Sequence, residues 1–292
     1  MNILTNEFLE VGLHPKGAEI IKIIGKQDGL NYMWKRDPIQ WANSAPILFP
    51  IIGKVVNDTY RVEGKEYHLT GHGFSRHSEY DVIESSDTKV VYQLKSNEEL
   101  LKVYPYHFVL TVTYQLTGKE LSCHCHVENI DSKEIYFQVG GHPAFACPLL
   151  EDESSNDYYL EFEKNETVKQ RIIDSSVGFM SDQSSLFLDN EKRFFIRQQL
   201  FNTDAIVLEQ LQSNYVDLKS FNHDKYIRFY MEGFNFLGIW AAKHVGGLIA
   251  IEPWVGHTDF AGFTGELKEK AGVCKLEKGK EFSCCFKIEV NQ

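Results

Sequence analysis

Short segments in which hydrophobic and polar residues alternate occupy most of the chain. Residues 3–25 contain two or three such segments, which are joined by a turn at His14-Pro15-Lys16-Gly17. Four more lie between residues 78 and 127, with turn residues between them. Alternation with a period of two predicts half-buried strands, because successive side chains of a strand face opposite sides of the sheet. Evenly spaced short strands are typical of an all-β sandwich or barrel.

The same pattern predicts strands in most of the remaining chain. We expect a hairpin from Asp58 to Leu69 and a strand at Asn31–Trp34. The Ser/Asp-rich stretch Ser181–Asp189 predicts a loop. The helical signal is a single turn at Asn97–Lys102, since no segment sustains a period of 3.6 residues. No repeat, linker or low-complexity tract interrupts residues 1–292, so we expect one β-sandwich domain.

The amino-acid composition supports a strand-rich fold and narrows the range of functions. The chain has 20 Phe, 14 Tyr and 4 Trp, which favours strands and leaves aromatic rings for stacking on sugars. Its formal net charge is −11 and it has no basic stripe, which argues against nucleic acid and anionic membranes as partners. An acidic chain can still bind a phosphorylated small molecule through one or two local Arg or Lys residues.

The N-terminus and the cysteines indicate the compartment. Residues 1–7 lack the basic region and the long apolar run of a signal peptide, and no apolar stretch reaches the length of a transmembrane helix. The six cysteines are scattered through strand-like segments, without the spacing of a disulfide framework. We therefore expect a reduced, cytoplasmic protein.

The first candidate for chemistry is His142, in the stretch Gly140-Gly141-His142-Pro143-Ala144-Phe145-Ala146-Cys147-Pro148. An apolar run, Ile135–Val139, precedes it and predicts a buried strand. The two glycines permit a sharp turn and a close approach of the backbone to a ligand. Pro143 biases His142 toward an extended conformation. A histidine held in this way suits proton transfer at neutral pH, but an ordinary half-buried turn histidine explains the stretch equally well.

Two more candidates, His72 and Glu252, lie in similar settings. His72 lies between glycines after the predicted hairpin, and Arg76 follows with its fork of donors for hydroxyls, carboxylate or phosphate. A turn histidine is the alternative for His72. Glu252 follows the apolar run Leu248–Ile251 and precedes Pro253, so we place it at a strand end. Glutamate is uncommon in strands, and a partly buried one beside an aromatic residue suits a general base with a raised pKa.

Lys54 and Asp204 are weaker candidates. The segment Ala45–Lys54 is too broken by proline for a central strand and too apolar for an exposed loop. It is either a buried loop that delivers Lys54 to a cleft or core filling that ends in a surface lysine. Asp204 either caps a turn before a predicted strand or reaches a ligand hydroxyl.

The run Cys123-His124-Cys125-His126 has the residue types of a metal site. On a strand, His124, His126 and Glu128 share one face, and with a distant histidine they form a cupin-like ligand set. Strand alternation explains the run as well, because the cysteines then fill the buried face as small hydrophobic residues. No second Cys/His cluster has zinc-like spacing, so we expect no metal and keep a cupin-like metal enzyme as an alternative.

We expect His72, His142, Glu252 and Arg76 to converge on one cleft. Two histidines and a carboxylate suit proton shuttling on a polyhydroxylated substrate. No Gly-x-Ser-x-Gly elbow or reactive-cysteine context indicates a covalent nucleophile.

The segments that carry these residues also resemble a known family. Ala45–Lys54, His72–Arg76, Gly141–Phe145, Asp204-Ala205 and Glu252–Gly256 are similar, in order, to motifs of the aldose 1-epimerase (galactose mutarotase) family. The chain most resembles the LacX-like branch, near the hexose-6-phosphate mutarotases. The resemblance implies a β-supersandwich of antiparallel sheets without metal or organic cofactor. It also implies reversible interconversion of the α and β anomers of a hexose.

By the same resemblance, Glu252 is the base that removes the proton of the anomeric hydroxyl. His142 donates a proton to the ring oxygen, and reclosure on the other face reverses both roles. His72 holds or polarises the region of the ring oxygen, while Arg76 and Asp204 bind hydroxyls.

One position departs from the family pattern. Lys54 stands where an arginine is usual, and lysine keeps the charge but loses the bidentate fork. The sugar, free or phosphorylated, therefore stays open, and we expect a monomer or homodimer. A non-catalytic carbohydrate-binding or sensing protein is the alternative function, although binding alone needs neither an acid nor a base.

Overall fold

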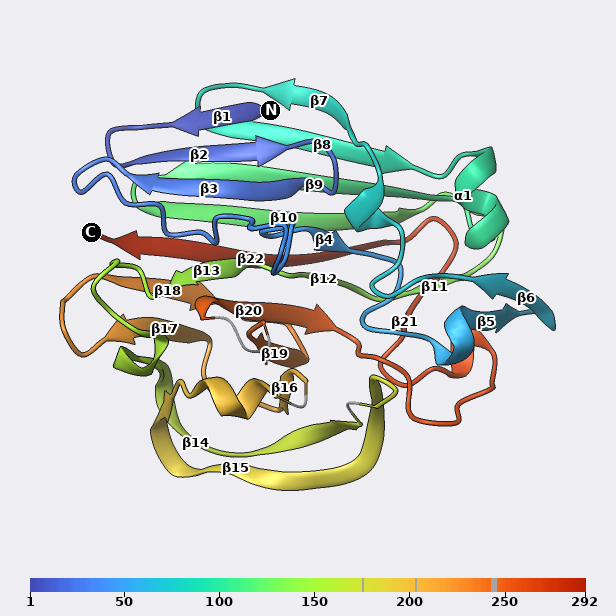
Figure 1. Ribbon diagram of the computed structural model, residues 1–292. Helices are drawn as coiled ribbons and strands as arrows, with labels where there is room; N and C mark the ends of the chain where they lie inside the picture. The colour runs from blue at the N-terminus through green and yellow to red at the C-terminus, as the bar shows by residue number, and fades with distance from the viewer. Residues whose placement is uncertain (175, 203, 243–245) are drawn as a thin grey trace.

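A computed structural model of the protein describes residues 1–174, 176–202, 204–242 and 246–292 (Figure 1). Within these residues, antiparallel strands form one sheet of 15 strands and three smaller sheets of three, two and two strands. One hydrophobic core cluster includes residues from Leu4 to Val290 and so reaches both ends of the chain. The prediction of an all-β supersandwich is confirmed.

The chain begins with the three-stranded sheet, as the alternation of residues 3–25 predicts. Its strands are β1 (Asn2–Thr5), β2 (Leu9–His14) and β3 (Glu19–Gly25). Tyr92 donates a hydrogen bond to Asn2 Oδ1 at 2.9 Å, and Tyr114 donates to the carbonyl of Ala18 at 2.7 Å. These bonds fasten the small sheet to the large one.

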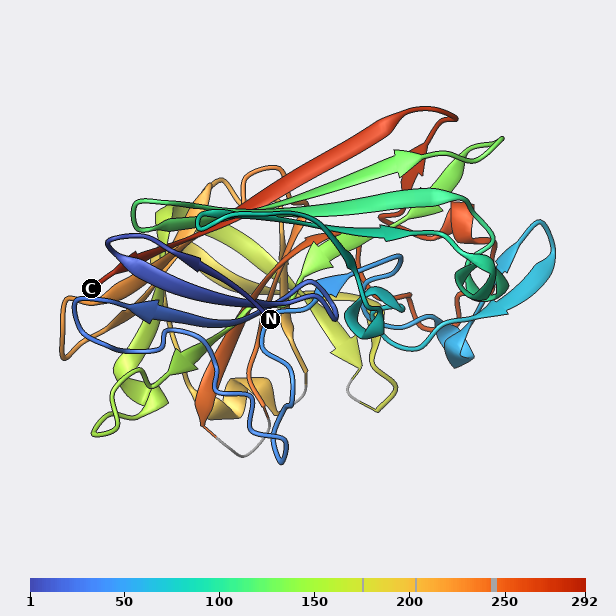
Figure 2. The same cartoon turned by 90° about the horizontal axis from the view of Figure 1, so that it is seen from above.

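One half of the large sheet is a meander that the C-terminal strand completes. It contains β7 (Asp81–Ser85), β8 (Lys89–Lys95), β9 (Phe108–Thr117), β10 (Glu120–Asn129) and β22 (Glu281–Asn291). Figure 2 shows these strands as one layer, with the three-stranded sheet beneath it. The predicted helical turn is α1 (Glu98–Val103), and the Asn97 side chain caps it by accepting the Leu100 N–H at 2.9 Å.

The other half of the large sheet surrounds the candidate site. It contains β4 (Ile47–Leu48), β12 (Val139–Gly141), β13 (Ala144–Cys147), β14 (Tyr158–Asp174), β15 (Phe179–Phe195), β16 (Ile206–Glu209), β17 (Tyr215–Ser220), β18 (Tyr226–Tyr230), β19 (Phe236–Trp240) and β20 (Gly247–Val255). Pairing of β18 with β22 joins the two halves. Ser181–Asp189 lies within β15, so the predicted loop is wrong. Most side chains of β15 are solvent-exposed, which allows Ser and Asp in a strand.

The remaining strands form two small sheets. The predicted hairpin is β5 (Thr59–Val62) with β6 (Lys65–His68), and β11 (Ile135–Phe137) pairs with β21 (Cys274–Leu276). Ile135–Val139 is therefore not one strand, because Gln138 separates β11 from β12. Asn31–Trp34 forms only isolated bridges. The short 3-10 turns are η1 (Val56–Asp58), η2 (Ser75–His77), η3 (Ser155–Asp157), η4 (Gln198–Phe201) and η5 (Leu267–Glu269).

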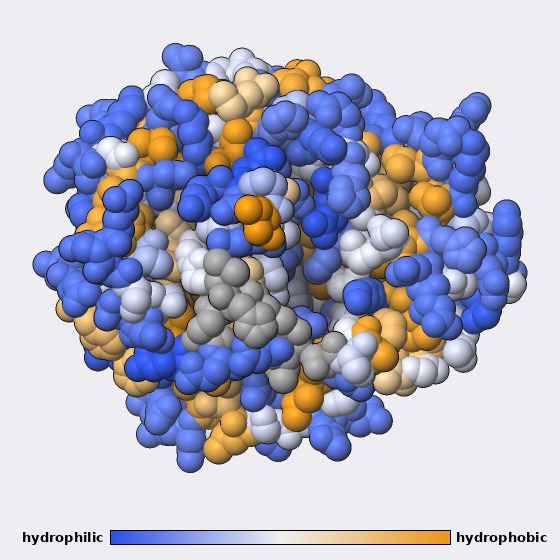
Figure 3. All heavy atoms as spheres, in the orientation of Figure 1, coloured by the Kyte–Doolittle hydropathy of each residue, from blue (hydrophilic) through white to orange (hydrophobic). Residues whose placement is uncertain are grey.

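Exposed apolar side chains are scattered among hydrophilic ones on the face in Figure 3. No helix in the part of the chain that the structure describes is long and apolar enough to cross a bilayer. All six cysteines are free thiols, as their spacing predicts.

Candidate active site

The site lies at the break where β12 ends and β13 begins, since both strands pair with β20 and His142 lies between them. β13 pairs Ala144 with Ala250, and β12 pairs Gly140 with Trp254. The same register continues across the break and sets His142 opposite Glu252. β20 runs on to Val255, so the prediction that Glu252 ends its strand is wrong. Pro253 is tolerated because the neighbouring strand is interrupted at this point.

His142 and Glu252 form a buried acid/base pair. His142 Nε2 lies 3.3 Å from Glu252 Oε2, and their side chains are 9% and 2% exposed. Burial lowers the pKa of His142 well below its ordinary value, and the nearby His72 and Arg76 lower it further. Burial also raises the pKa of Glu252 well above its ordinary value, with a further contribution from Asp204. Both shifts favour the neutral forms, so a proton shared by the pair favours Glu252 over His142.

The two glycines before His142 serve protein packing rather than ligand approach. A Cβ at Gly140 would lie 2.5 Å from the carbonyl oxygen of Pro253, and one at Gly141 would lie 2.9 Å from the ring of Phe286. The expectation that these glycines let the backbone approach a ligand is wrong. They let β12 pack closely against β20 and β22 instead.

His72 is fixed as a neutral hydrogen-bond donor. Its backbone N–H donates to the Gly53 carbonyl at 2.7 Å, and the Gly53 N–H donates to Nδ1 at 3.3 Å. Burial, with the cations Arg76 and Lys54 nearby, lowers the pKa of His72 to about 3. The neutral ring therefore carries its proton on Nε2. His72 also has a left-handed φ of 64°, a conformation that is uncommon for non-glycine residues.

All six residues predicted for the site line one cavity of about 260 Å³, namely Lys54, His72, Arg76, His142, Asp204 and Glu252. The volume is just below the range of about 300–1,000 Å³ that is usual for drug-sized ligands, so it suits one sugar ring. Arg76 is part of η2. The Lys54 side chain packs on Gly178, because a Cβ added to Gly178 would lie 3.0 Å from Lys54 Nζ. Asp204 Oδ1 accepts the Ala205 N–H at 2.7 Å, so it also caps its turn.

Unpaired polar atoms concentrate in this cavity. Among the described residues, six buried side-chain nitrogen or oxygen atoms lack a hydrogen-bond partner. Four of them belong to cavity residues: Arg76 Nε, His142 Nδ1, Glu252 Oε2 and Trp254 Nε1. Buried polar groups are normally paired, so this cluster indicates a place for a ligand with several hydroxyl groups.

Comparison with known proteins identifies the family. The aldose 1-epimerase family model matches residues 2–269. The chain belongs to the aldose 1-epimerase family. Protein LacX of Lactococcus lactis subsp. lactis is 36% identical over 282 residues, which are 94% of this chain and 93% of the relative.

Two solved structures share the fold closely. A galactose mutarotase related enzyme from Lactobacillus acidophilus has a TM-score of 0.94 and 31% identity, covering 99% of this chain and 97% of that one. A galactose mutarotase-like protein from Lactobacillus casei also has a TM-score of 0.94, with 33% identity over the full length of both chains. The family and these neighbours make the protein a sugar isomerase of the mutarotase type.

Sequence reasoning missed the aromatic walls of the enzyme's cavity. Trp41 packs on the His142 ring with centroids 4.5 Å apart, and Trp240 meets the same ring edge-on at 5.6 Å. Trp34 Nε1–H donates to the Trp41 carbonyl at 2.8 Å and fixes this irregular segment. The tryptophans are visible in the sequence as possible stacking groups, but no local pattern shows which of them reaches the cavity.

A buried ion pair supports the wall that carries Lys54. Lys270 Nζ lies 2.5 Å from Asp259 Oδ1, and the side chains are 2% and 3% exposed. Asp259 also accepts the Val56 N–H at 3.0 Å and donates its own N–H to the Lys54 carbonyl at 2.9 Å. Thr258 Oγ1 accepts the Lys54 N–H at 3.0 Å. The pair thus holds residues 54–56 in place.

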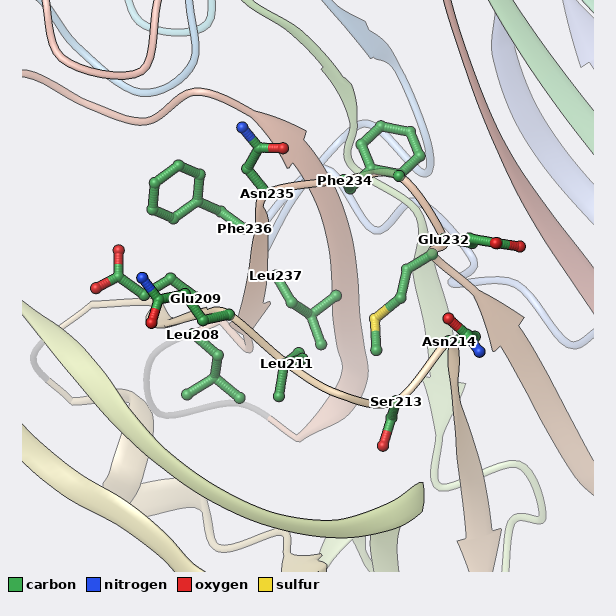
Figure 4. A pocket seen from close by; sticks show the side chains of 13 residues that line it. Leu208, Glu209, Leu211, Ser213, Asn214, Glu232, Phe234, Asn235, Phe236 and Leu237 are labelled. Carbon is green, nitrogen blue, oxygen red and sulfur yellow. The ribbon is translucent and has the colours of Figure 1, made fainter.

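Two other groups of residues lie outside this site. A smaller hollow of about 80 Å³ lies beside β16 and β19, and Leu208, Leu211 and Leu237 are among the residues that line it (Figure 4). Its titratable lining residues are Glu209 and Glu232. His124, His126 and Glu128 lie on β10, and none of them lines the cavity.

Proposed function

We propose that the enzyme interconverts the α and β anomers of an aldohexose, free or phosphorylated, by opening and reclosing the sugar ring. The observation that carries this proposal is the His142–Glu252 pair, 3.3 Å apart, beside a cavity with four unpaired buried polar atoms. A non-reacting binding site needs neither an acid nor a base, whereas ring opening needs both at once.

Ring opening uses the pair in its charged form. The Glu252 carboxylate takes the proton of the anomeric hydroxyl, the bond between C1 and the ring oxygen breaks, and protonated His142 gives its proton to that oxygen. A sugar hydroxyl that donates to the unpaired Glu252 Oε2 favours the carboxylate, since hydrogen bonding stabilises the charged form. After ring opening the proton is on Glu252 and His142 is neutral.

This second form is the one that the pKa shifts of His142 and Glu252 favour. Rotation about the C1–C2 bond then presents the other face of the aldehyde. Glu252 returns its proton to the carbonyl oxygen, His142 takes the proton of the attacking hydroxyl, and the opposite anomer forms. Before ring opening, after ring opening and after reclosure, His142 and Glu252 hold a single proton between them. The reaction therefore consumes no proton from solvent.

The other cavity residues position the sugar. Neutral His72 offers Nε2–H as a donor to the region of the ring oxygen, and Arg76 and Asp204 bind hydroxyls. Lys54, whose ammonium has no ion pair among the described residues, is placed for a hydroxyl or a phosphate at the rim of the cavity.

Polarimetry tests the proposal directly. Freshly dissolved α-glucose, α-galactose and their 6-phosphates are followed with and without the enzyme, and the panel also identifies the preferred sugar. We expect acceleration over buffer for at least one of them. Saturable sugar binding without acceleration of any of them, by well-folded protein, would instead support the non-catalytic carbohydrate-binding alternative.

A further inference from the structure

The outer face of the paired strands β10 and β22 carries a row of polar side chains, and none of them lines the catalytic cavity. Antiparallel pairing sets His124 opposite Cys285, His126 opposite Ser283 and Glu128 opposite Glu281. The alternate residues of β10, including Cys123, Cys125 and Val127, point into the core. The polar row therefore lies on the solvent side of this layer, which forms the upper surface in Figure 2.

At two positions, or rungs, of this strand pair, glutamates lie directly opposite each other, but only one of the two glutamate pairs has a lysine that offsets its negative charge. At one end, Glu120 faces Glu289, Lys287 Nζ lies 3.2 Å from Glu120, and Tyr230 donates to Glu289 at 2.8 Å. At the other end Glu128 faces Glu281, and no Lys or Arg among the described residues pairs with either. Like charges directly opposite each other destabilise a strand pair, so this second rung has a place for a cation.

His126 is oriented toward that rung. Its Nε2 lies 3.5 Å from Glu281 Oε2, and its Nδ1 is 2.8 Å from Ser283 Oγ. One ligand atom from each of His126, Glu128 and Glu281 lies within 4.8 Å of the other two. Histidine ligands of metals typically bind a hydrogen-bond partner through the second ring nitrogen, which is the arrangement that Ser283 provides.

We propose that His126, Glu128 and Glu281 bind one divalent transition-metal ion of the zinc type, with water in the remaining positions. One imidazole nitrogen and two carboxylate oxygens form a ligand set that Zn²⁺ accepts readily. The ion joins β10 to the C-terminal strand β22 and neutralises the uncompensated rung. This site differs from the cupin-like alternative, because Glu281 takes the place of His124, whose Nε2 lies 3.5 Å from Cys285 Sγ, and because it is separate from the cavity.

Calorimetric titration of tag-free, chelator-treated full-length protein with Zn²⁺ tests the site. We expect saturable binding at one site and a rise in Tm on adding Zn²⁺, because an ion that binds only the folded state stabilises it. His126→Ala and Glu281→Gln should each abolish both effects. Ser283→Ala should weaken binding by about 10-fold, the lower end of the loss that follows removal of a metal ligand's hydrogen-bond partner.

His124→Ala and Cys285→Ser are the matched controls, since they lie one rung away on the same face. Both should bind Zn²⁺ as the unmodified protein does, and mutarotase activity should be unchanged in His126→Ala. Absence of saturable binding overturns the proposal. Binding that is lost in the two controls but kept in His126→Ala and Glu281→Gln also overturns it, by assigning the ion to the cysteine rung.

Discussion

Two glutamates of this enzyme are equally buried but differ in their surroundings. Glu166 and Glu252 are each 1% exposed. Glu166, on β14, accepts the N–H groups of Gln212 and Ser213 at 3.1 and 2.8 Å and the Ser213 hydroxyl at 2.6 Å. Glu252 Oε2, on β20, has no hydrogen-bond partner among the described residues, and His142 Nε2 lies 3.3 Å from it.

The difference separates structural from chemical use of the same side chain. A buried carboxylate with three donors closes a turn and contributes to stability. A buried carboxyl group without hydrogen-bond donors lowers the stability of the folded protein. Such a group is retained where a ligand or a bound proton supplies the interaction that the protein does not. Burial alone therefore does not indicate function in this fold, and the two glutamates differ in whether the buried carboxyl group meets hydrogen-bond donors.

The largest expected effect is a loss of activity in Glu252→Gln. The amide has the shape of the protonated carboxyl group but takes up no proton, so we expect the mutarotation rate to fall by about 10²–10⁴-fold. Stability should change little, because burial favours the neutral form of the carboxyl group, which the amide resembles. Polarimetry and thermal unfolding of the same preparation measure both quantities.

Glu166→Gln is the matched control for that variant. It replaces a carboxylate that three donors surround, so we expect reduced Tm and an unchanged mutarotation rate per folded molecule. If Glu166→Gln lost activity and Glu252→Gln lost only stability, the distinction between the two glutamates would be wrong.

Next in size is the effect of Lys270→Met on stability. Removing the lysine leaves Asp259 buried and unpaired, which should lower the free energy of unfolding by about 3–5 kcal/mol. Urea unfolding measures this loss. The double variant Asp259→Asn/Lys270→Met removes both charges and should recover part of it, whereas equal loss in the single and double variants would show that the ion pair is not the cause.

The smallest effect in this series is on substrate affinity. Trp41→Ala removes the ring that packs on His142, and an aromatic contact of this kind contributes about 0.5–1.5 kcal/mol. We expect KM to rise several-fold and kcat to fall less than KM rises. Trp41→Phe, which keeps a ring, should restore most of the affinity, and an unchanged KM in Trp41→Ala would exclude Trp41 from the sugar site.

The sequence contains much of this architecture because strands and short motifs are local signals. Alternation predicts β1–β3 and the hairpin β5–β6. His72 and Glu252 are recognisable from their sequence neighbours alone, which are glycines for His72 and Pro253 for Glu252. The polar composition of Ser181–Asp189 fits both a loop and a solvent-facing strand. Composition does not distinguish those two cases without the partner strand.

The parts of the site that the sequence does not predict depend on contacts between segments far apart in the chain. The bond from the Lys54 N–H to Thr258 joins residues 204 positions apart, and nothing near Lys54 in the sequence indicates it. The same holds for the contact of Trp41 with His142. Gly140 and Gly141 show the opposite error, since a local pattern that suits ligand approach serves packing against Pro253 and Phe286.

The pH dependence of kcat/KM for sugar mutarotation tests the central claim, that His142 and Glu252 share one catalytic proton. A second proton on the pair occupies the base, and loss of the single proton removes the acid, so activity must fall on both sides. Because the pKa of His142 is lowered below its ordinary 6.5 and that of Glu252 is raised above its ordinary 4.5, we predict a bell-shaped profile. Its acid limb should lie below 6.5 and its basic limb above 4.5. A profile with a single limb, measured where the protein stays folded, would contradict the shared proton.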